Sequence, residues 1–258
     1  MTVSELTKSQ RLRLGASLWT GAVVGAVAVT VGVFPQLTAD IELPAPLWLI
    51  GIASFLQTSI MMAIAVWGGL RLAPSLGLRA PAFEAAATGG SVAAALKPQI
   101  PPGLVLGALG GVFLFAGMRL SPAPILAVQE RFNPPILARI LYGGISEEVL
   151  LRWGVMTVIA WLAWRFVQGR RGDVKPGVMW AANVVSAVLF GVGHLPAARV
   201  LLGSLDLNVV VFVIGLNATF GLVFGWLYWR RGLESAMVAH AITHLVNYVI
   251  TGVAKTLG

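Results

Sequence analysis

The chain has 258 residues, of which 57% are apolar and 11% charged, and its mean hydropathy is +0.85. Average globular domains carry about 25% charged residues, so this composition excludes a soluble domain and predicts that most of the chain faces lipid. The absence of cysteine excludes disulfides, thiolate metal sites and a cysteine nucleophile. A net charge of +8 would suggest nucleic acid for a soluble protein. Membrane proteins gather Lys and Arg in cytoplasmic loops, however, and we expect no nucleic-acid partner.

Apolar runs long enough to cross a bilayer occur along the whole chain, since one crossing needs about 20 apolar residues. We therefore predict an all-α fold, a polytopic transmembrane bundle that forms a single integral membrane domain over residues 1–258. The seven expected spans are 14–35, 46–69, 102–119, 141–164, 176–196, 209–229 and 233–253. The first run is longer than the ~7–15 apolar residues of a signal-peptide core, so we interpret it as an uncleaved span.

Two segments between the spans are expected at the membrane interface. Residues 70–101 are rich in Ala, Gly and Pro, and we interpret them as an interfacial or loop segment. The segment near 120–140 contains four prolines, and both an amphipathic interfacial helix and a re-entrant segment are compatible with it. In the third span, the four-residue spacing of Gly103, Gly107 and Gly111 indicates close contact with another helix.

Positive charges divide unequally between the two ends of this bundle. With the N-terminus inside, twelve Lys and Arg residues fall on the inner side, five fall on the outer side, and Arg152 lies within a span. The inner residues are Lys8, Arg11, Arg13, Arg71, Arg79, Lys97, Arg165, Arg170, Arg171, Lys175, Arg230 and Arg231. The outer residues are Arg119, Arg131, Arg139, Arg199 and Lys255. The positive-inside rule therefore predicts an internal N-terminus, in a membrane that we expect to be a bacterial cytoplasmic membrane.

A few ionisable residues lie inside the predicted spans, where a charge costs ~2.5–3.5 kcal/mol even on the mildest scale. The fourth span contains two acids and a base, the fifth ends on a histidine, and the seventh contains two histidines. These residues are Glu147, Glu148, Arg152, His194, His240 and His244. Because such residues persist mainly where they pair or line a cavity, we expect them to form one polar site.

Helical spacing indicates different roles for the two adjacent carboxylates. Glu148 and Arg152 are four residues apart, so they can pair in the favourable order with Glu before Arg. Glu147 is rotated by about 100° from its neighbour and is left for other chemistry. One carboxylate is then neutralised while the other remains available, a division that general acid and base catalysis requires.

The histidines also share helix faces with other candidate residues. His240, His244 and Asn247 follow the i, i+4, i+7 spacing of one face, and Phe190 and His194 share a face of the fifth span. Taken singly, a buried histidine is more often a hydrogen-bonded core residue, and a Glu–Arg pair is more often structural. Taken together on three helices, these residues predict that the fourth, fifth and seventh spans converge on one site.

The order of these residues resembles that of a known family. Glu-Glu-x-x-x-Arg, then Phe-x-x-x-His about forty residues later, then His-x-x-x-His in the last apolar helix is similar to the pattern of the CPBP intramembrane proteases. That family includes the type II CAAX prenyl endopeptidases and bacteriocin-processing or immunity homologues. The resemblance covers residues 141–250, which we interpret as the catalytic helices. It implies an intramembrane endopeptidase that hydrolyses a peptide bond with an activated water.

The resemblance also implies a role for each candidate residue. The implied catalytic positions are Glu147, His194, His240 and His244. The implied supporting positions are Glu148, Arg152, Phe190 and Asn247. The first glutamate and first histidine would hold and activate the water, and the last two histidines would stabilise the oxyanion. The family commonly has Asn where this chain has His244, and Asn247 is one turn further on.

Two mechanisms remain open for these residues. A carboxylate and imidazoles can form a zinc site with an open fourth position, for which the ligands would be Glu147, His194, His240 and His244. No His-Glu-x-x-His motif is present, and we favour water activation without an obligatory metal. The expected partners are membrane lipid and a peptide or protein substrate, lipidated or not.

Two other function classes are compatible with intramembrane Glu, His and Arg. A proton-coupled transporter also uses such residues, although the chain shows no inverted repeat. A catalytically silent immunity or binding protein would retain the same scaffold. With the N-terminus inside, the site lies nearer the outer face, whereas a CAAX-type substrate requires cytoplasmic access.

Overall fold

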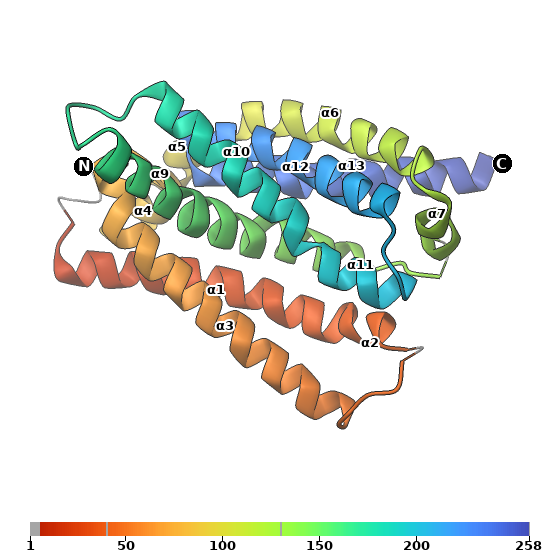
Figure 1. Ribbon diagram of the computed structural model, residues 1–258. Coiled ribbons are helices and arrows are strands. Elements are labelled where there is room, and N and C mark those ends of the chain that lie inside the picture. Colours follow the sequence, from red (N-terminus) through yellow and green to blue (C-terminus); the bar gives the residue numbers. More distant parts are fainter. Residues whose placement is uncertain (1–5, 40, 130, 258) are drawn as a thin grey trace.

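The computed structural model describes residues 6–39, 41–129 and 131–257, which contain helices and no strand (Figure 1). Within these residues, seven segments are long and apolar enough to cross a membrane. They are Lys8–Gly32, Leu47–Leu76, Ile100–Arg119, Ile136–Val167, Pro176–Leu202, Leu207–Arg230 and Leu233–Leu257. Each predicted span overlaps one of them. The expected all-α polytopic bundle is therefore confirmed.

Up to residue 119, the described part of the chain forms three long helices and four short ones. They are α1 (Lys8–Gly32), α2 (Phe34–Leu37), α3 (Leu47–Leu72), η2 (Ala73–Leu76), α4 (Pro81–Thr88), α5 (Val92–Leu96) and α6 (Ile100–Arg119). Thr7 caps α1, because its side chain accepts a hydrogen bond from Gln10 N while the Gln10 side chain accepts one from Thr7 N. The predicted interfacial or loop segment, residues 70–101, contains η2, α4 and α5.

The second part contains the helices that carry the candidate site. They are α7 (Ala123–Gln129), α8 (Ile136–Ala138), η3 (Arg139–Glu147), η4 (Val149–Met156), α9 (Thr157–Leu162), η5 (Ala163–Val167), α10 (Pro176–Gly193), α11 (Leu195–Leu202), α12 (Leu207–Arg230) and α13 (Leu233–Leu257). Of the two structures considered for the segment near 120–140, the chain forms a short helix, α7, at the end of the bundle where α13 ends (Figure 1).

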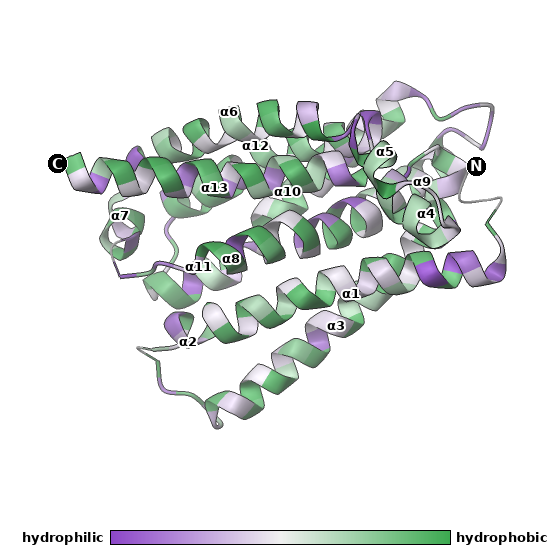
Figure 2. Ribbon diagram, turned by 180° about the vertical axis from the view of Figure 1, so that it is seen from behind, coloured by the Kyte–Doolittle hydropathy of each residue, from purple (hydrophilic) through white to green (hydrophobic). Residues whose placement is uncertain are grey.

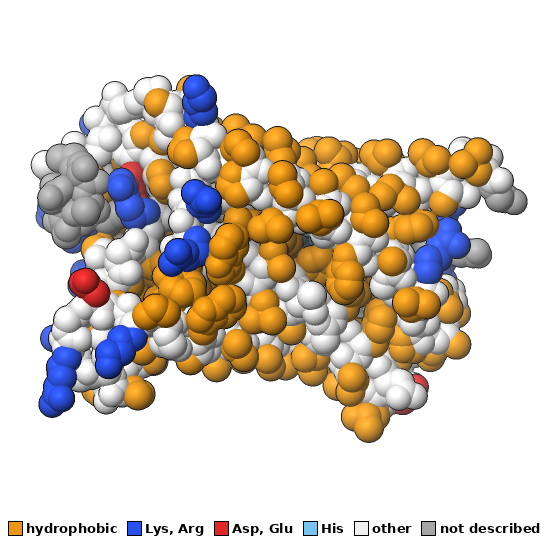
Figure 3. Space-filling view, turned by 90° about the horizontal axis from the view of Figure 1, so that it is seen from above, with side chains coloured by type: hydrophobic (Ala, Val, Ile, Leu, Met, Phe, Trp, Pro, Cys, Tyr) orange, Lys and Arg blue, Asp and Glu red, His pale blue; other side chains and the backbone are white. Residues whose placement is uncertain are grey.

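The two chain ends lie at opposite ends of the bundle (Figure 1). Hydrophilic residues are concentrated toward the end where α1 begins, and hydrophobic residues cover the length of the helices (Figure 2). Lys and Arg side chains gather at that same end and are sparse at the other (Figure 3). The charge asymmetry that the sequence predicts is thus an asymmetry between the two ends of the molecule.

The fourth span departs from the regular α-helix that its hydropathy predicts. Three stretches, η3, η4 and η5, have the wider turn of a π-helix. Glu147 is the last residue of η3, and Glu148 lies between η3 and η4. Such wide turns are rare, usually short, and frequent at functional sites.

Glycines bring α6 into close contact with α13. A Cβ atom added to Gly103, Gly107 or Gly111 would lie between 2.5 and 2.8 Å from an atom of α13. Side chains larger than hydrogen at these positions would force the two helices apart. The glycine spacing noted in the sequence therefore holds in place the helix that carries His240 and His244.

Candidate active site

Glu148 is fully buried and contacts two basic side chains. Its Oε2 lies 3.1 Å from Nε of Arg152, one turn further along the span. Its Oε1 lies 2.8 Å from Nδ1 of His240 on α13, and since a carboxylate only accepts, this imidazole nitrogen donates the hydrogen bond. Glu148 therefore links the fourth and seventh spans through its two oxygens.

Arg152 is held by charge and by aromatic rings. The contact between its Nε and Glu148 is short enough for an ion pair but is not aligned as a hydrogen bond. Within the described residues, none of its three guanidinium nitrogens has a hydrogen-bond partner. Instead, the guanidinium carbon lies 5.2 Å from the ring centroid of Phe190 and 6.0 Å from that of Phe224. These cation–π contacts compensate part of the cost of burying the charge.

Glu147 lies between two imidazoles. Its Oε1 is 3.9 Å from Nε2 of His194, and its Oε2 is 3.7 Å from Nε2 of His240. The side chain of Glu147 is 17% exposed and that of His194 is 36% exposed, whereas that of Glu148 is 0% exposed. The two neighbouring carboxylates thus occupy different environments, one sealed and neutralised, the other accessible.

The hydrogen bonds of His194 define its tautomer. Its Nδ1 lies 2.8 Å from the carbonyl oxygen of Phe190, which only accepts, so Nδ1 carries the proton. In the neutral ring, Nε2 then has a free lone pair, and this nitrogen is the one nearest Glu147. His194 lies between α10 and α11, and its ring packs edge-to-face on that of Phe190, with centroids 4.8 Å apart.

His244 joins the site through ring stacking. Its ring stacks on that of His240 at a centroid distance of 5.0 Å, and His240 stacks on Phe224 at 4.6 Å. A Cβ atom on Gly143 would lie 2.9 Å from Nε2 of His244 and 3.0 Å from Nε2 of His240. Gly143, one turn before Glu147, therefore leaves the room that both imidazoles occupy.

Most of the candidate residues lie together. The structure joins Glu147, Glu148, Arg152, Phe190, His194, His240 and His244 through the contacts above. Asn247 is buried on α13, but in the part of the chain that the structure describes it forms no hydrogen bond or ion pair with the other candidates. The sequence did not indicate the bond between Glu148 and His240, nor the contributions of Phe224 and Gly143. An apolar ring and a glycine in apolar spans carry no signal of their own.

A zinc site at these residues would need at least three side chains placed to bind one ion. Across the described ranges, no group of three or more His, Cys, Asp or Glu side chains is placed to hold a metal ion. His240 uses Nδ1 for Glu148 and stacks between Phe224 and His244. We therefore derive no step through the four-residue zinc site that the sequence left open.

Comparison with known families agrees with the order of the motifs. Residues 130–246 match a family model described as type II CAAX prenyl endopeptidase Rce1-like. The match includes every candidate site residue except Asn247, and it agrees with the resemblance that the sequence motifs show. Neither the curated proteins nor the solved structures give a significant match to the chain.

The contacts of Arg152 predict a large effect on stability. Arg152→Met would leave Glu148 as a buried charge with reduced compensation, and we expect a loss of about 3–5 kcal/mol, measured by unfolding in detergent. In the double variant Glu148→Gln and Arg152→Met, neither charge remains, so much of this loss should be recovered. Equal stability of Arg152→Met and the wild-type protein would contradict the structural role of this ion pair.

Proposed function

We propose that this chain, which over residues 130–246 belongs to the Rce1-like family of type II CAAX prenyl endopeptidases, hydrolyses a peptide bond inside the membrane with a water activated by Glu147. The family is one of membrane proteases, and the seven apolar helices make the chain an integral membrane protein. The observation that carries the proposal is the accessible carboxylate of Glu147 between two imidazole nitrogens, beside a neutralised Glu148.

The distances around Glu147 suit a water between the carboxylate and His194. A direct hydrogen bond to an imidazole nitrogen would be about 2.7–3.2 Å long, and both observed separations are greater. A bridging water can donate one hydrogen to Oε1 of Glu147 and the other to the free lone pair of His194 Nε2. Two acceptors on one water increase its nucleophilicity, so Glu147 takes the role of general base.

The reaction then follows from the positions of the acceptors and donors. As the water oxygen bonds to the substrate carbonyl carbon, its proton passes to Glu147. The carbonyl oxygen becomes an oxyanion, and His240 and His244 are the residues proposed to stabilise it. Glu148 accepts from Nδ1 of His240 and so fixes the orientation of this ring, whose Nε2 lies 3.7 Å from Oε2 of Glu147. Collapse of the tetrahedral intermediate then breaks the C–N bond, and Glu147 returns the proton to the leaving amine.

We propose this mechanism without an obligatory metal and with a peptide or protein substrate. The proposal of a metal-free mechanism is supported by the donor arrangement around Glu147, because the described side chains form no group of three or more that is placed to hold a metal. The proposal of a peptide or protein substrate is supported by the matched family, whose description names prenyl endopeptidases. A silent binding protein would keep the same contacts and is distinguished by the absence of cleavage.

Replacing the base tests the proposed activity directly. Glu147→Gln keeps the volume of the side chain and removes its basicity, so cleavage should fall by about 10²–10⁴-fold while thermal stability is unchanged. The measurement is hydrolysis of a prenylated and an unprenylated peptide by purified protein in lipid. Glu42→Gln, a change at an exposed residue outside the spans, is the matched control and should retain full activity. Equal rates for Glu147→Gln and wild-type protein would rule out this role.

His244 separates the two mechanisms. If its imidazole donates to the oxyanion, His244→Asn restores a donor and should keep much of the activity, while His244→Ala should lose about 10²–10³-fold. If His244 were a zinc ligand, Asn would lose metal and activity together. We expect an active Asn variant and little zinc, by elemental analysis, in any of the three purified proteins. Stoichiometric zinc that disappears with activity in His244→Asn would establish a metalloprotease.

The orientation of the chain determines which substrates reach the site. We propose that the N-terminus lies inside, since Lys and Arg gather at the end where α1 begins (Figure 3). Single cysteines introduced at Lys175 and Arg199 should then react with impermeant reagents from the inside and the outside, respectively. The opposite labelling would give His194 and Glu147 cytoplasmic access, as a CAAX substrate requires.

A further inference from the structure

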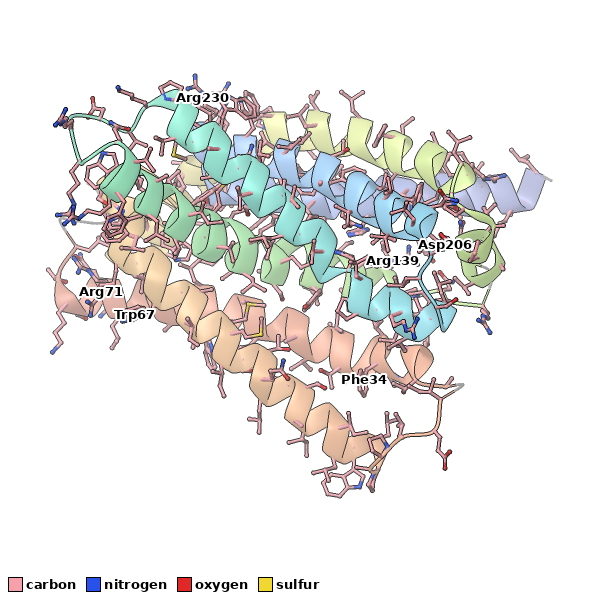
Figure 4. The ribbon with its side chains drawn as sticks, viewed as in Figure 1. Phe34, Trp67, Arg71, Arg139, Asp206 and Arg230 are labelled. Carbon is pink, nitrogen blue, oxygen red and sulfur yellow. The ribbon has the colours of Figure 1, made fainter. Side chains whose placement is uncertain are left out.

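A cavity of about 470 Å³ lies at the end of the bundle where α1 begins, and none of the candidate active-site residues lines it. Three connections of the chain surround it, those between η2 and α4, between α5 and α6, and between α12 and α13. Figure 4 shows Arg230, one of its lining residues, toward the edge of the bundle at that end. Small-molecule sites have volumes of roughly 300–1,000 Å³, so the cavity is large enough for a ligand.

Hydrogen bonds hold the walls of this cavity in place. Leu233 N donates to the carbonyl oxygen of Arg79 at 3.1 Å, which joins the α12–α13 turn to the segment before α4. Oε1 of Glu234 accepts from two backbone N–H groups in the first turn of α4, at 2.7 and 3.0 Å. The α12–α13 turn requires Gly232, whose φ of +131° is rarely adopted by other residues. The fold therefore forms the cavity in advance, as is usual for small-molecule sites.

Two guanidinium groups give the cavity a net positive charge. Its arginines are Arg79, Arg230 and Arg231. The charge of Arg79 is compensated, because its Nε and Nη2 donate to Oε2 of Glu84 at 2.9 and 2.6 Å. In the described ranges, no carboxylate lies within ion-pair distance of Arg230 or Arg231. The guanidinium fork binds phosphate through paired hydrogen bonds, so these two residues indicate a phosphate ligand.

Gln99 contributes an unsatisfied acceptor to the same cavity. Its side chain lines the cavity and is 4% exposed, and its Oε1 accepts no hydrogen bond from the described residues. Gly232 leaves space beside this oxygen, since a Cβ atom there would lie 3.1 Å from it. Buried polar atoms without a partner are few in folded proteins, and a ligand is one way to satisfy them. A hydroxyl group beside the phosphate would supply the missing donor.

The position of the cavity along the helices indicates the headgroup level of a bilayer. The span Ile100–Arg119 begins beside it, and the span Leu207–Arg230 ends at it. Trp229 lines the cavity and packs edge-to-face on Trp180, and tryptophans are enriched at the membrane interface. The first turns of α6 present exposed apolar side chains, along which acyl chains can lie. A phospholipid can use both surfaces, whereas a free phosphate compound can use only the cavity.

We propose that this cavity binds the phosphoglycerol headgroup of an anionic phospholipid. Its phosphate contacts Arg230 and Arg231, and a glycerol hydroxyl donates to Gln99. A headgroup that carries its own cation is disfavoured, because the two arginines repel it. The site is separate from the residues proposed for catalysis, so the proposal does not depend on the proposed function. A bound headgroup joins the α5–α6 connection to the start of α13, and its binding free energy stabilises the folded protein.

Lipid titrations of the full-length protein in a neutral detergent test this proposal. Short-chain phosphatidylglycerol should raise the midpoint of thermal unfolding at a concentration at least about 10-fold lower than short-chain phosphatidylcholine. Glycerol phosphate and inorganic phosphate, which lack acyl chains, should leave the midpoint unchanged over the same range. Equal stabilisation by the two lipids would overturn the proposal. Stabilisation by either free phosphate compound at the concentration needed for phosphatidylglycerol would overturn it in favour of a soluble ligand.

Variants of the lining residues locate the binding. Arg230→Gln with Arg231→Gln should raise the required concentration of phosphatidylglycerol by about 10–100-fold, and Lys at both positions should retain part of the affinity. The matched control, Arg13→Gln with Arg171→Gln, removes two exposed charges assigned to the same end and should leave the titration unchanged. Ala95→Phe fills the cavity and keeps every charge, so it should also abolish the lipid preference. A preference that survives the double Gln variant or Ala95→Phe would contradict this site.

The hydroxyl contact has a separate test. Phosphatidylmethanol keeps the charged phosphate but lacks the headgroup hydroxyls, so the wild-type protein should bind it about 3–10-fold more weakly than phosphatidylglycerol. Gln99→Leu removes the acceptor and should make the two affinities equal. Equal affinities in the wild-type protein would overturn the assignment of Gln99.

Discussion

A carboxylate sealed inside a membrane bundle requires a compensating positive charge, and Glu148 imposes this requirement on three other helices. Its oxygens contact Arg152 and His240, which fixes α13 against the fourth span. Arg152 in turn lies over Phe190 of α10 and Phe224 of α12. The contacts that compensate this one buried charge therefore join four transmembrane segments, the fourth span, α10, α12 and α13. They do so immediately beside Glu147.

This arrangement separates two chemically identical neighbours. Both oxygens of Glu148 contact basic side chains, and its own side chain is closed to solvent. Glu147 has no ion-pair contact as short as those of Glu148 and is partly exposed. The support given by the first carboxylate is what leaves the second free to exchange a proton with water.

The spans were predictable because hydropathy is a local property, and the Glu148–Arg152 pair because it lies one turn apart in a single helix. The bond from Glu148 to His240 was not, since its partners are separated by 92 positions and meet only after α13 packs on η3 and η4. Phe224 was missed because an aromatic residue in an apolar span has no distinguishing signal. The π-helical turns of the fourth span also lack a signature in its apolar sequence.

The exposed fraction of the side chains at the site decreases from His194 through Glu147 to His240 and Arg152. The open end of this gradient is the junction of α10 and α11, which lies toward the end of the bundle where α7 and the C-terminus are found (Figure 1). Water and peptide therefore have their shortest route to Glu147 from the end with few positive charges. In the proposed reaction, the side of the membrane that this end faces thus determines which peptides can reach Glu147.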